Sequence, residues 1–502
     1  MSMLALVLLL VVGGIAAAVS ERLNDNLPRM VSLGILLAAL LLALSWLGAD
    51  PGAAGVFNSE GPWWLYLKLP WIERFGISLE LGLDGLSLVL LLLTLLLGIV
   101  AVLSSWTEID FRPGLFQANL LWTLAGVCGV FLALDLFLFF VFWEVMLVPM
   151  YLLIAIWGHE KRAYAAMKFF LFTQFSGLLM LLAIVVLAWN AAVLTGSPTF
   201  SYRELLEVPL GPTMAWLTML GFFAAFAVKL PAFPFHTWLP DAHTQAPTAG
   251  SVLLAGILLK TGAYGLLRFC LPLFPETSAD FAPIAMTLGL LGVFYGAVLA
   301  FAQRDVKRLV AYSSVSHMGF VLLGVYAWNT LAVQGAIMQM VAHGVSTAAL
   351  FMLAGALQQR LHTRDMERMG GLWQQAPRMG ACALIFALAS LGLPGMGNFI
   401  AEFLILAGLF ATHPLFAAAA ALGLVTAAVY SLWLVQRTFQ GAPDPSRTMA
   451  DFGTRELGTM VALVLALLWL GLNPQPVLDL TAPVLNGFHQ MVASGNVAGG
   501  AP

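Results

Sequence analysis

Residues 222–267 read FFAAFAVKLPAFPFHTWLPDAHTQAPTAGSVLLAGILLKTGAYGLL and place two lysines, Lys229 and Lys260, inside apolar stretches. A lysine near the middle of a bilayer costs about 2.5–3.5 kcal/mol on insertion scales. Two glutamates, Glu144 in FFVFWEVMLVPM and Glu402 in GNFIAEFLILAG, are equally out of place. The four charges together amount to roughly 10 kcal/mol of unfavourable burial, which a purely structural bundle has no reason to carry. The pattern therefore indicates a path for protons or ions across a membrane.

The composition of the whole chain also indicates a membrane protein. The sequence is 61% hydrophobic and 9% charged, against about 25% charged residues in a soluble domain. Its three cysteines, Cys128, Cys270 and Cys382, lie far apart in apolar runs, so neither a CxxC pair nor an iron–sulfur spacing occurs. We therefore expect no cofactor and no metal site in this chain, and nothing indicates binding to nucleic acid.

Apolar runs long enough to cross about 30 Å of hydrocarbon recur along the chain and predict an all-α integral membrane protein with about fourteen spans. The first is not a signal peptide, because no lysine or arginine precedes its apolar core. The long run 379–411 is interrupted by LPGMG at 393–397, which predicts two half-helices. The predicted spans are 2–19, 29–48, 84–104, 116–134, 136–156, 165–189, 213–231, 249–271, 281–301, 309–327, 331–357, 379–411, 414–437 and 456–473.

The distribution of basic residues predicts the orientation. With the amino terminus outside, the cytoplasmic loops hold sixteen lysines and arginines and the opposite loops hold four, which with Lys229 and Lys260 make up the 22 in the chain. An excess of positive charge on one side marks the cytoplasmic face. We therefore expect a multi-pass protein of the bacterial inner membrane with both termini in the periplasm.

Two interrupted spans indicate an internal duplication. The break at Lys229-Leu230-Pro231 and Pro234 resembles the break at Pro394-Gly395, and each carries one ionisable residue, Lys229 or Glu402. Such paired breaks are typical of repeat-built transporters. The odd number of spans between them predicts two inverted five-helix repeats, each with a discontinuous helix, although prolines are also ordinary in membrane helices. The predicted divisions are 1–115 with three helices, repeats at 116–271 and 281–437, and 438–502 with the last helix and a periplasmic tail.

Four histidines lie in or beside apolar segments and suit a proton relay, because histidine titrates near physiological pH. His236 and His243 stand in a proline-broken connection that we expect to be buried, and His317 and His343 lie in adjacent spans. Each is equally consistent with a hydrogen-bonded packing role. His317 and His343 also raise bis-histidine haem ligation as a rival, but haem gives no account of the two lysines. His159 falls in a loop and is expected at the solvated surface.

These motifs resemble those of the antiporter-like subunits of respiratory complex I, which are related to Mrp-type cation/proton antiporters. The resemblance rests on FAVKLP at 226–231, HTWLPDAHTQAPTAGS at 236–251, LLKT at 258–261, SSVSHMGF at 313–320 and LPG…FIAEF at 393–403. It covers nearly the whole chain. The motifs RFGISL at 74–79, DGLS at 84–87 and WEVMLVPMY at 143–151 are similar to those of M-type members, the bacterial counterparts of mitochondrial subunit four. A subunit of an Mrp-type antiporter is the alternative.

The resemblance implies a proton-translocating subunit of NADH:quinone oxidoreductase. Glu144 and Lys229, if in contact, would hold each other ionised. A proton would come from the cytoplasm, rest on Lys260 and pass by way of His343 to Glu402, with His236, His243 and His317 as secondary members. The resemblance also implies that L- and N-type membrane subunits are the neighbours of this chain. FMN and iron–sulfur clusters are expected in partner subunits, and quinone is expected to reach the chain only through the complex. Moving one proton against 100 mV costs about 2.3 kcal/mol, which such partners must supply.

Overall fold

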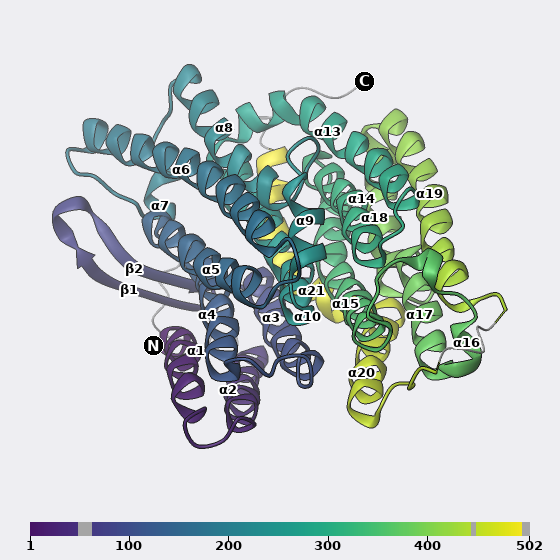
Figure 1. Ribbon diagram of the computed structural model, residues 1–502. Coiled ribbons are helices and arrows are strands. Elements are labelled where there is room, and N and C mark those ends of the chain that lie inside the picture. Colours follow the sequence, from purple (N-terminus) through teal and green to yellow (C-terminus); the bar gives the residue numbers. More distant parts are fainter. Residues whose placement is uncertain (49–62, 443–447, 494–502) are drawn as a thin grey trace.

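The computed structural model describes residues 1–48, 63–442 and 448–493 of the 502-residue chain. It is a bundle of long helices with one small sheet, and the chain colours run from the N-terminal helices on one flank to the C-terminal helices on the other (Figure 1). The predicted periplasmic position of residue 502 lies outside the described residues.

Thirteen helices among the described residues are long and apolar enough to cross a membrane. The spans agree with the predicted positions, and α17 (Pro377–Ser390) and α18 (Gly397–Thr412), both too short alone, share the remaining predicted span at 379–411. The thirteen are α1 (Ser2–Ser20), α2 (Leu27–Leu44) with the turn after it, α3 (Gly85–Ser104), α4 (Pro113–Leu132), α5 (Leu136–Trp157), α6 (Arg162–Thr195), α8 (Pro212–Lys229), Thr248–Leu273, α13 (Pro275–Phe301), α14 (Val306–Tyr326), α15 (Thr330–Leu361), α19 (Pro414–Phe439) and α20 (Thr454–Leu472).

Both predicted breaks are present. α8 ends at Lys229, and the chain turns through 230–237 before the short helix α9 (Trp238–Gln245). α17 and α18 are separated by 391–396, where Gly392 and Gly395 have φ of +79° and +94°. L-residues with side chains rarely adopt such φ values, so these glycines permit the sharp turn after α17. The inverted repeat and its divisions remain a prediction.

The helix that carries Lys260 is irregular. Thr248–Leu273 consists of α10 (Thr248–Leu253), a π turn (Leu254–Leu258), α11 (Leu259–Gly265), a second π turn (Leu266–Cys270) and α12 (Leu271–Leu273). It approaches α15 closely, because a Cβ added at Gly344 would lie 2.8 Å from the carbonyl oxygen of Gly256. This contact between glycines brings the backbones of the two helices together just before Lys260.

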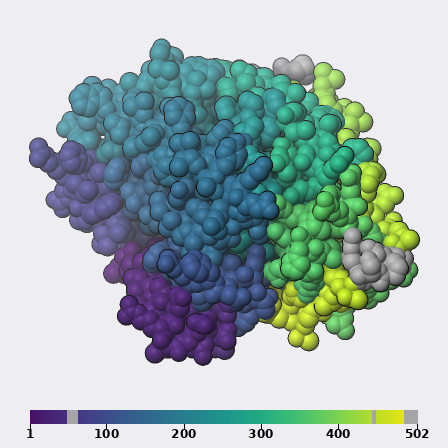
Figure 2. Space-filling model, in the orientation of Figure 1, coloured from purple at the N-terminus to yellow at the C-terminus, as the bar shows by residue number. Residues whose placement is uncertain are grey.

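The helices differ strongly in burial. The most apolar stretch of α15 is wholly buried, and those of α14 and Thr248–Leu273 are 94% buried. In α20, by contrast, only 28% of this stretch is buried. The space-filling view shows a closed outer face over α5 and α6 (Figure 2). The central helices are the ones that hold Lys260, His317 and His343, so these side chains are shielded by other helices rather than facing the bilayer.

The prediction of an all-helical chain omitted one element. β1 (Leu65–Ile72) and β2 (Ile77–Leu83) form an antiparallel hairpin. It is fastened to the rest of the fold by a bridge from Leu81 to Ala133, and the amide of Leu134 donates to the carbonyl of Glu80 at 2.9 Å. The hairpin therefore belongs to the packed structure and is not a free loop.

The region after the last span, where a periplasmic tail is predicted, contains one more helix. Residues Gln475–Ala493 form α21, and the Gly/Ala-rich end of the tail lies outside the described residues. This helix packs against α3 and α15, and a Cβ on Gly85 would meet the carbonyl oxygen of Leu480. α21 thus covers the beginning of α3.

Candidate functional site: a buried relay

Lys260 and His343 are in direct contact in the centre of the protein. Lys260 is fully buried in α11 and His343 is 1% exposed in α15, and the distance from Lys260 Nζ to His343 Nδ1 is 2.8 Å. Lys260 also donates to the carbonyl of Ala255, in the first π turn. No carboxylate pairs with Lys260 among the described residues, in agreement with the absence of a nearby acid in the sequence. A lysine held by two neutral acceptors can lose its proton more readily than one held by an acid.

His317, on α14, joins His343 to Glu402. The rings of His317 and His343 have centroids 5.5 Å apart, and His317 Nδ1 lies 3.1 Å from Oε1 of Glu402. The family resemblance implied only a secondary role for His317, but this residue lies between His343 and Glu402. Lys260, His343, His317 and Glu402 therefore form a continuous series of contacts from α11 to α18.

Three polar residues without charge complete this series, and the sequence analysis missed them. Gln339 Nε2 donates to Glu402 Oε1 at 3.2 Å. The oxygens of Ser390 and Tyr430 each lie 3.1 Å from His317 Nε2. All three are buried polar side chains in apolar helices, and this is the only signal that marks them in the sequence. They hold the His317 ring and the Glu402 carboxylate in one orientation.

The predicted contact between Glu144 and Lys229 is not formed. Among the described residues no ion pair joins them, and neither Lys229 Nζ nor Glu144 Oε1 has a hydrogen-bond partner. Lys229 Nζ instead lies over the rings of Trp143 and Phe169, 5.1 Å and 5.6 Å from their centroids. The reason is that the Glu144 side chain is directed toward α6, where a Cβ added at Gly177 would lie 2.9 Å from its Oε1, whereas Lys229 lies over the ring of Trp143.

His236 and His243 are both buried, as predicted for their stretch, but they differ in surroundings. His236 stacks on Phe233 and touches Tyr295. His243, on α9, stacks on Phe351 with centroids 4.3 Å apart, and Lys260, His343 and Lys307 all lie within electrostatic reach of it. The structure thus brings His243 close to the relay and leaves His236 outside it.

The contacts of the histidines leave haem ligation without support. Both ring nitrogens of His317 already have hydrogen-bond partners, and His343 Nδ1 contacts Lys260. A haem iron needs a free nitrogen from each histidine and room for the macrocycle between the two rings. In the part of the chain that the structure describes, no group of three or more histidine, cysteine or acidic side chains could hold a metal ion, and the three cysteines are buried and unpaired.

Comparison with known proteins identifies the class. Residues 133–429 match the family model "NADH:quinone oxidoreductase/Mrp antiporter, TM". The chain therefore belongs to this family of membrane subunits. It is 54% identical over 496 residues to NADH-quinone oxidoreductase subunit M of Pseudomonas aeruginosa, with 97% of each chain covered.

Two solved structures have the same fold. A chain of respiratory complex I from Thermus thermophilus with bound NADH superposes with a TM-score of 0.88 and 34% identity, over 98% of this chain and 100% of that one. A chain of the Mrp complex from Dietzia sp. DQ12-45-1b gives a TM-score of 0.85 at 21% identity, over 99% of both chains. The predicted resemblance to subunit M of complex I is confirmed, whereas the likeness to the Mrp chain is one of fold.

Proposed function

We propose that this chain moves protons across the membrane as the antiporter-like subunit M of an NADH:quinone oxidoreductase. The observation that carries the proposal is the series of buried contacts from Lys260 through His343 and His317 to Glu402, in which a ring contact and not a hydrogen bond joins the two histidines. Each member can gain or lose a proton, and such groups are rare in membrane interiors unless they serve transport.

In the relay, the ammonium of Lys260 gives a proton to Nδ1 of His343. His343 releases the proton from its other ring nitrogen to His317, and His317 passes one to the carboxylate of Glu402. Lys260 then regains a proton from the cytoplasmic side and Glu402 releases one, so the relay returns to its starting charge. Glu402 is the terminal acid and faces the next subunit, as the family resemblance implies.

In this proposal, Glu144 and Lys229 control proton transfer along the relay. The two charges lie within electrostatic reach of each other without touching. A change in their separation alters the potential at the buried relay, because charges in a low-dielectric interior act over longer distances than in water. A partner subunit supplies energy to the relay by causing this change in separation. FMN, iron–sulfur clusters and the quinone site belong to the partners, and L- and N-type subunits are the expected neighbours.

The test uses Lys260→Met in the complete complex, reconstituted in sealed vesicles. Methionine keeps the length of the side chain but cannot titrate, so proton pumping and NADH:quinone turnover should both fall by about 100-fold or more. Lys260→Arg should rescue poorly, since a guanidinium stays protonated above about pH 12. Normal pumping in an assembled Lys260→Met complex would refute the proposal.

We also propose that the chain lies in the bacterial inner membrane with both termini in the periplasm. The sixteen-to-four bias of basic residues supports this orientation. An alkaline phosphatase fused after residue 502 should be active and a fluorescent protein dark. The reverse result would place the carboxyl terminus in the cytoplasm and refute this orientation.

A further inference from the structure

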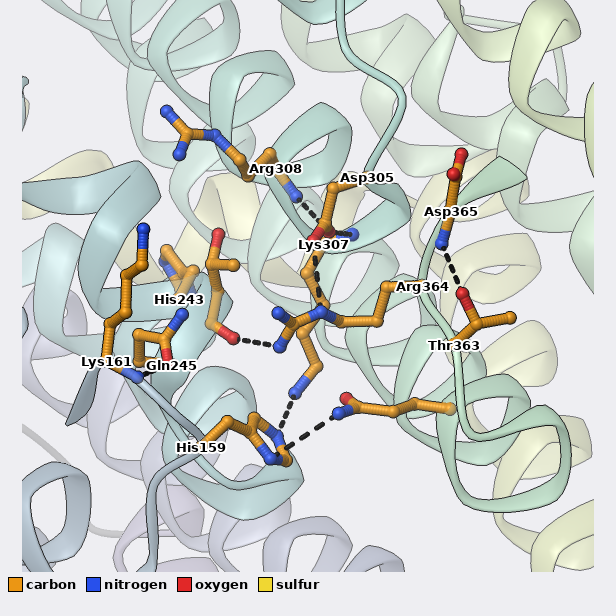
Figure 3. A network of polar contacts seen from close by, with 12 residues as sticks. His159, Lys161, His243, Gln245, Asp305, Lys307, Arg308, Thr363, Arg364 and Asp365 are labelled. Atoms are coloured by element: carbon orange, nitrogen blue, oxygen red, sulfur yellow. Dashed lines mark hydrogen bonds and ion pairs between the residues drawn. The ribbon is translucent and has the colours of Figure 1, made fainter. Parts of the chain in front are cut away.

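A second set of buried ionisable side chains lies beyond α9, away from Glu402. It gathers at the ends of α9 and α15 and at the beginning of α14 (Figure 3). We propose that protons reach Lys260 from the cytoplasm through His159, Lys307 and His243, in that order. The inference rests on the proposed function, because it supplies the first half of a path whose second half is the Lys260–Glu402 relay.

The route begins at a cavity of about 750 Å³. Its lining comes from the segment after α3, the loop between α5 and α6, the end of α15 and the residues before α20. Exposed Thr107 and His362 line it, so water can reach it. Arg360 and Glu456 in its wall pair with each other at 2.6 Å. His159, by contrast, has no carboxylate partner among the described residues, and it faces both the cavity and the protein interior.

His159 is held against α9 by its backbone. Its amide donates to the carbonyl of Gln245 at 2.9 Å, and the amide of Lys161 donates to the side chain of Gln245 at 2.8 Å. The ring joins two side chains: Nδ1 lies 3.4 Å from Gln358 Nε2 and Nε2 lies 3.5 Å from Lys307 Nζ. Contrary to the sequence expectation, His159 is therefore only partly exposed and links the cavity to a buried lysine.

The surroundings keep the His159 ring neutral at rest. Burial in the loop between α5 and α6, followed by the positive charges of Lys307 and Arg364, lowers the pKa of His159 to about 3. A neutral imidazole offers one nitrogen that accepts and one that donates. It can thus take a proton on one side and release another from the opposite side without storing charge.

Lys307 is the third fully buried lysine, although its sequence position suggested a loop charge. Its Nζ donates to the carbonyl of Ala246 at 3.0 Å. The nearby Asp305 is occupied elsewhere, because it pairs with Arg364 Nε at 3.0 Å and caps the first turn of α14. In the described structure Lys307 has no ion-pair partner, although the charges of Glu108, in the cavity lining, and Asp305 reach it. Figure 3 shows its side chain extending toward His159.

In the proposed route, His243 passes the proton from Lys307 to Lys260. Its side chain is fully buried, and neither ring nitrogen has a hydrogen-bond partner among the described residues. Lys307 Nζ donates to the carbonyl of Ala246, three residues after His243, and α9 packs against α14. The charges of Lys307 and Lys260 both reach the His243 ring. A buried imidazole with two unpaired nitrogens is costly to maintain, so we assign it the exchange of a proton with these two lysines.

The transfer balances at each step. The ammonium of Lys307 first gives a proton to His243, which releases one to Lys260. The neutral amine left on Lys307 then takes the proton on His159 Nε2, while a proton from water in the cavity binds His159 Nδ1. No oxidant or reductant takes part, and each group returns to its original charge after one passage.

The experiment compares Lys307→Met and His159→Gln with Lys161→Met in the complete complex in proteoliposomes. Lys161 is an exposed lysine in the same loop as His159, so its replacement should leave pumping unchanged. Lys307→Met should reduce pumping and turnover by about tenfold or more, because proton-transfer groups contribute at least that much. Proton uptake then limits the rate, so the ratio of turnover in H₂O to that in D₂O should rise in both test variants. A merely structural defect would lower the activity without raising this ratio.

Normal turnover and an unchanged isotope ratio in both test variants would overturn the route. If Lys260→Met is inactive in the same preparation, the proposed function stands and only the uptake route falls. If Lys260→Met is also active, the proposed function itself falls. Should Lys307→Met fail to assemble, His159→Gln decides alone, because the backbone bonds that hold its loop do not involve the ring.

Discussion

The two broken helices each hold one buried ionisable residue, but they hold it in different ways. Lys229, at the end of α8, is surrounded by the rings of Trp143 and Phe169 and makes no hydrogen bond through Nζ. Glu402, on α18, is bonded to His317 and Gln339. Both side chains are at most 2% exposed, so the difference lies in their partners and not in their burial.

This difference suggests two distinct tasks. Hydrogen bonds fix direction and distance, so the Glu402 carboxylate is kept where a proton can be exchanged. Aromatic faces attract a cation without fixing one geometry, so Lys229 can shift relative to Glu144 while it stays favourably placed. We therefore infer that Glu402, at the second break, is a proton station that takes up and releases a proton. Lys229, at the first break, is a movable charge.

The largest effect is expected at the proton station. Glu402→Gln removes the titrating group but keeps its shape, and pumping should fall by about 100-fold or more. Glu402→Asp still titrates and should retain more activity in the same pumping assay. Equal activities of the two variants would mean that the carboxyl acts only through shape or hydrogen bonding, and the contrast between the breaks would disappear.

The next effect concerns the movable charge. Glu144→Ala and Lys229→Ala should each lower pumping by about tenfold or more, because either change leaves a buried charge without its counterpart. The complex should still assemble, as judged by native gel electrophoresis. A Glu144→Ala complex that pumps normally in sealed vesicles would reduce the pair to a structural role.

The aromatic contact of Lys229 gives a smaller effect. Trp143→Leu removes a cation–π interaction of about 1 kcal/mol, which corresponds to an approximately fivefold loss of turnover. Trp143→Phe keeps an aromatic face and is the matched control, with activity closer to that of the natural chain. If leucine and phenylalanine at this position behave alike in steady-state kinetics, the rings do not hold Lys229.

The smallest effect is expected at Tyr430. Tyr430→Phe removes one of the two hydroxyl contacts of His317 Nε2, and Ser390 remains, so turnover should drop by only about twofold. Ser390→Ala should act similarly, and the double variant should lose more than the product of the single losses. If the loss of turnover in the double variant equals the product of the two single losses, the two hydroxyls act on His317 independently.

The sequence predicted the spans and both breaks because long apolar runs and prolines act locally. It also singled out Lys260 and Glu402, since charge in an apolar helix is visible without a structure. It could not show that Glu144 and Lys229 stay apart, because opposite charges do not reveal that Glu144 lies against Gly177 of α6 while Lys229 lies over Trp143. Gln339, Ser390 and Tyr430 escaped notice because an uncharged polar side chain in a helix carries no sign of what it contacts.

Segment ends were harder to predict than segment centres. Lys307 lies two residues after Asp305, the N-cap of α14, so its sequence position predicted a charged side chain in a loop. Neighbouring helices bury this side chain instead. The hairpin at 65–83 was missed because its pairing with Ala133 and Leu134 joins residues distant in sequence. Tertiary packing, rather than local pattern, decides such positions.

The place of Lys229 at the last residue of α8 has one more consequence. The aligned peptide dipoles of a helix produce about half a negative charge at its carboxyl end, which stabilises a nearby cation by about 0.3–2 kcal/mol. Because the helix stops inside the protein, this partial charge is buried beside the lysine and little screened by water. Lys229 thus has a permanent weak counter-charge in its own backbone, even while Glu144 is out of contact.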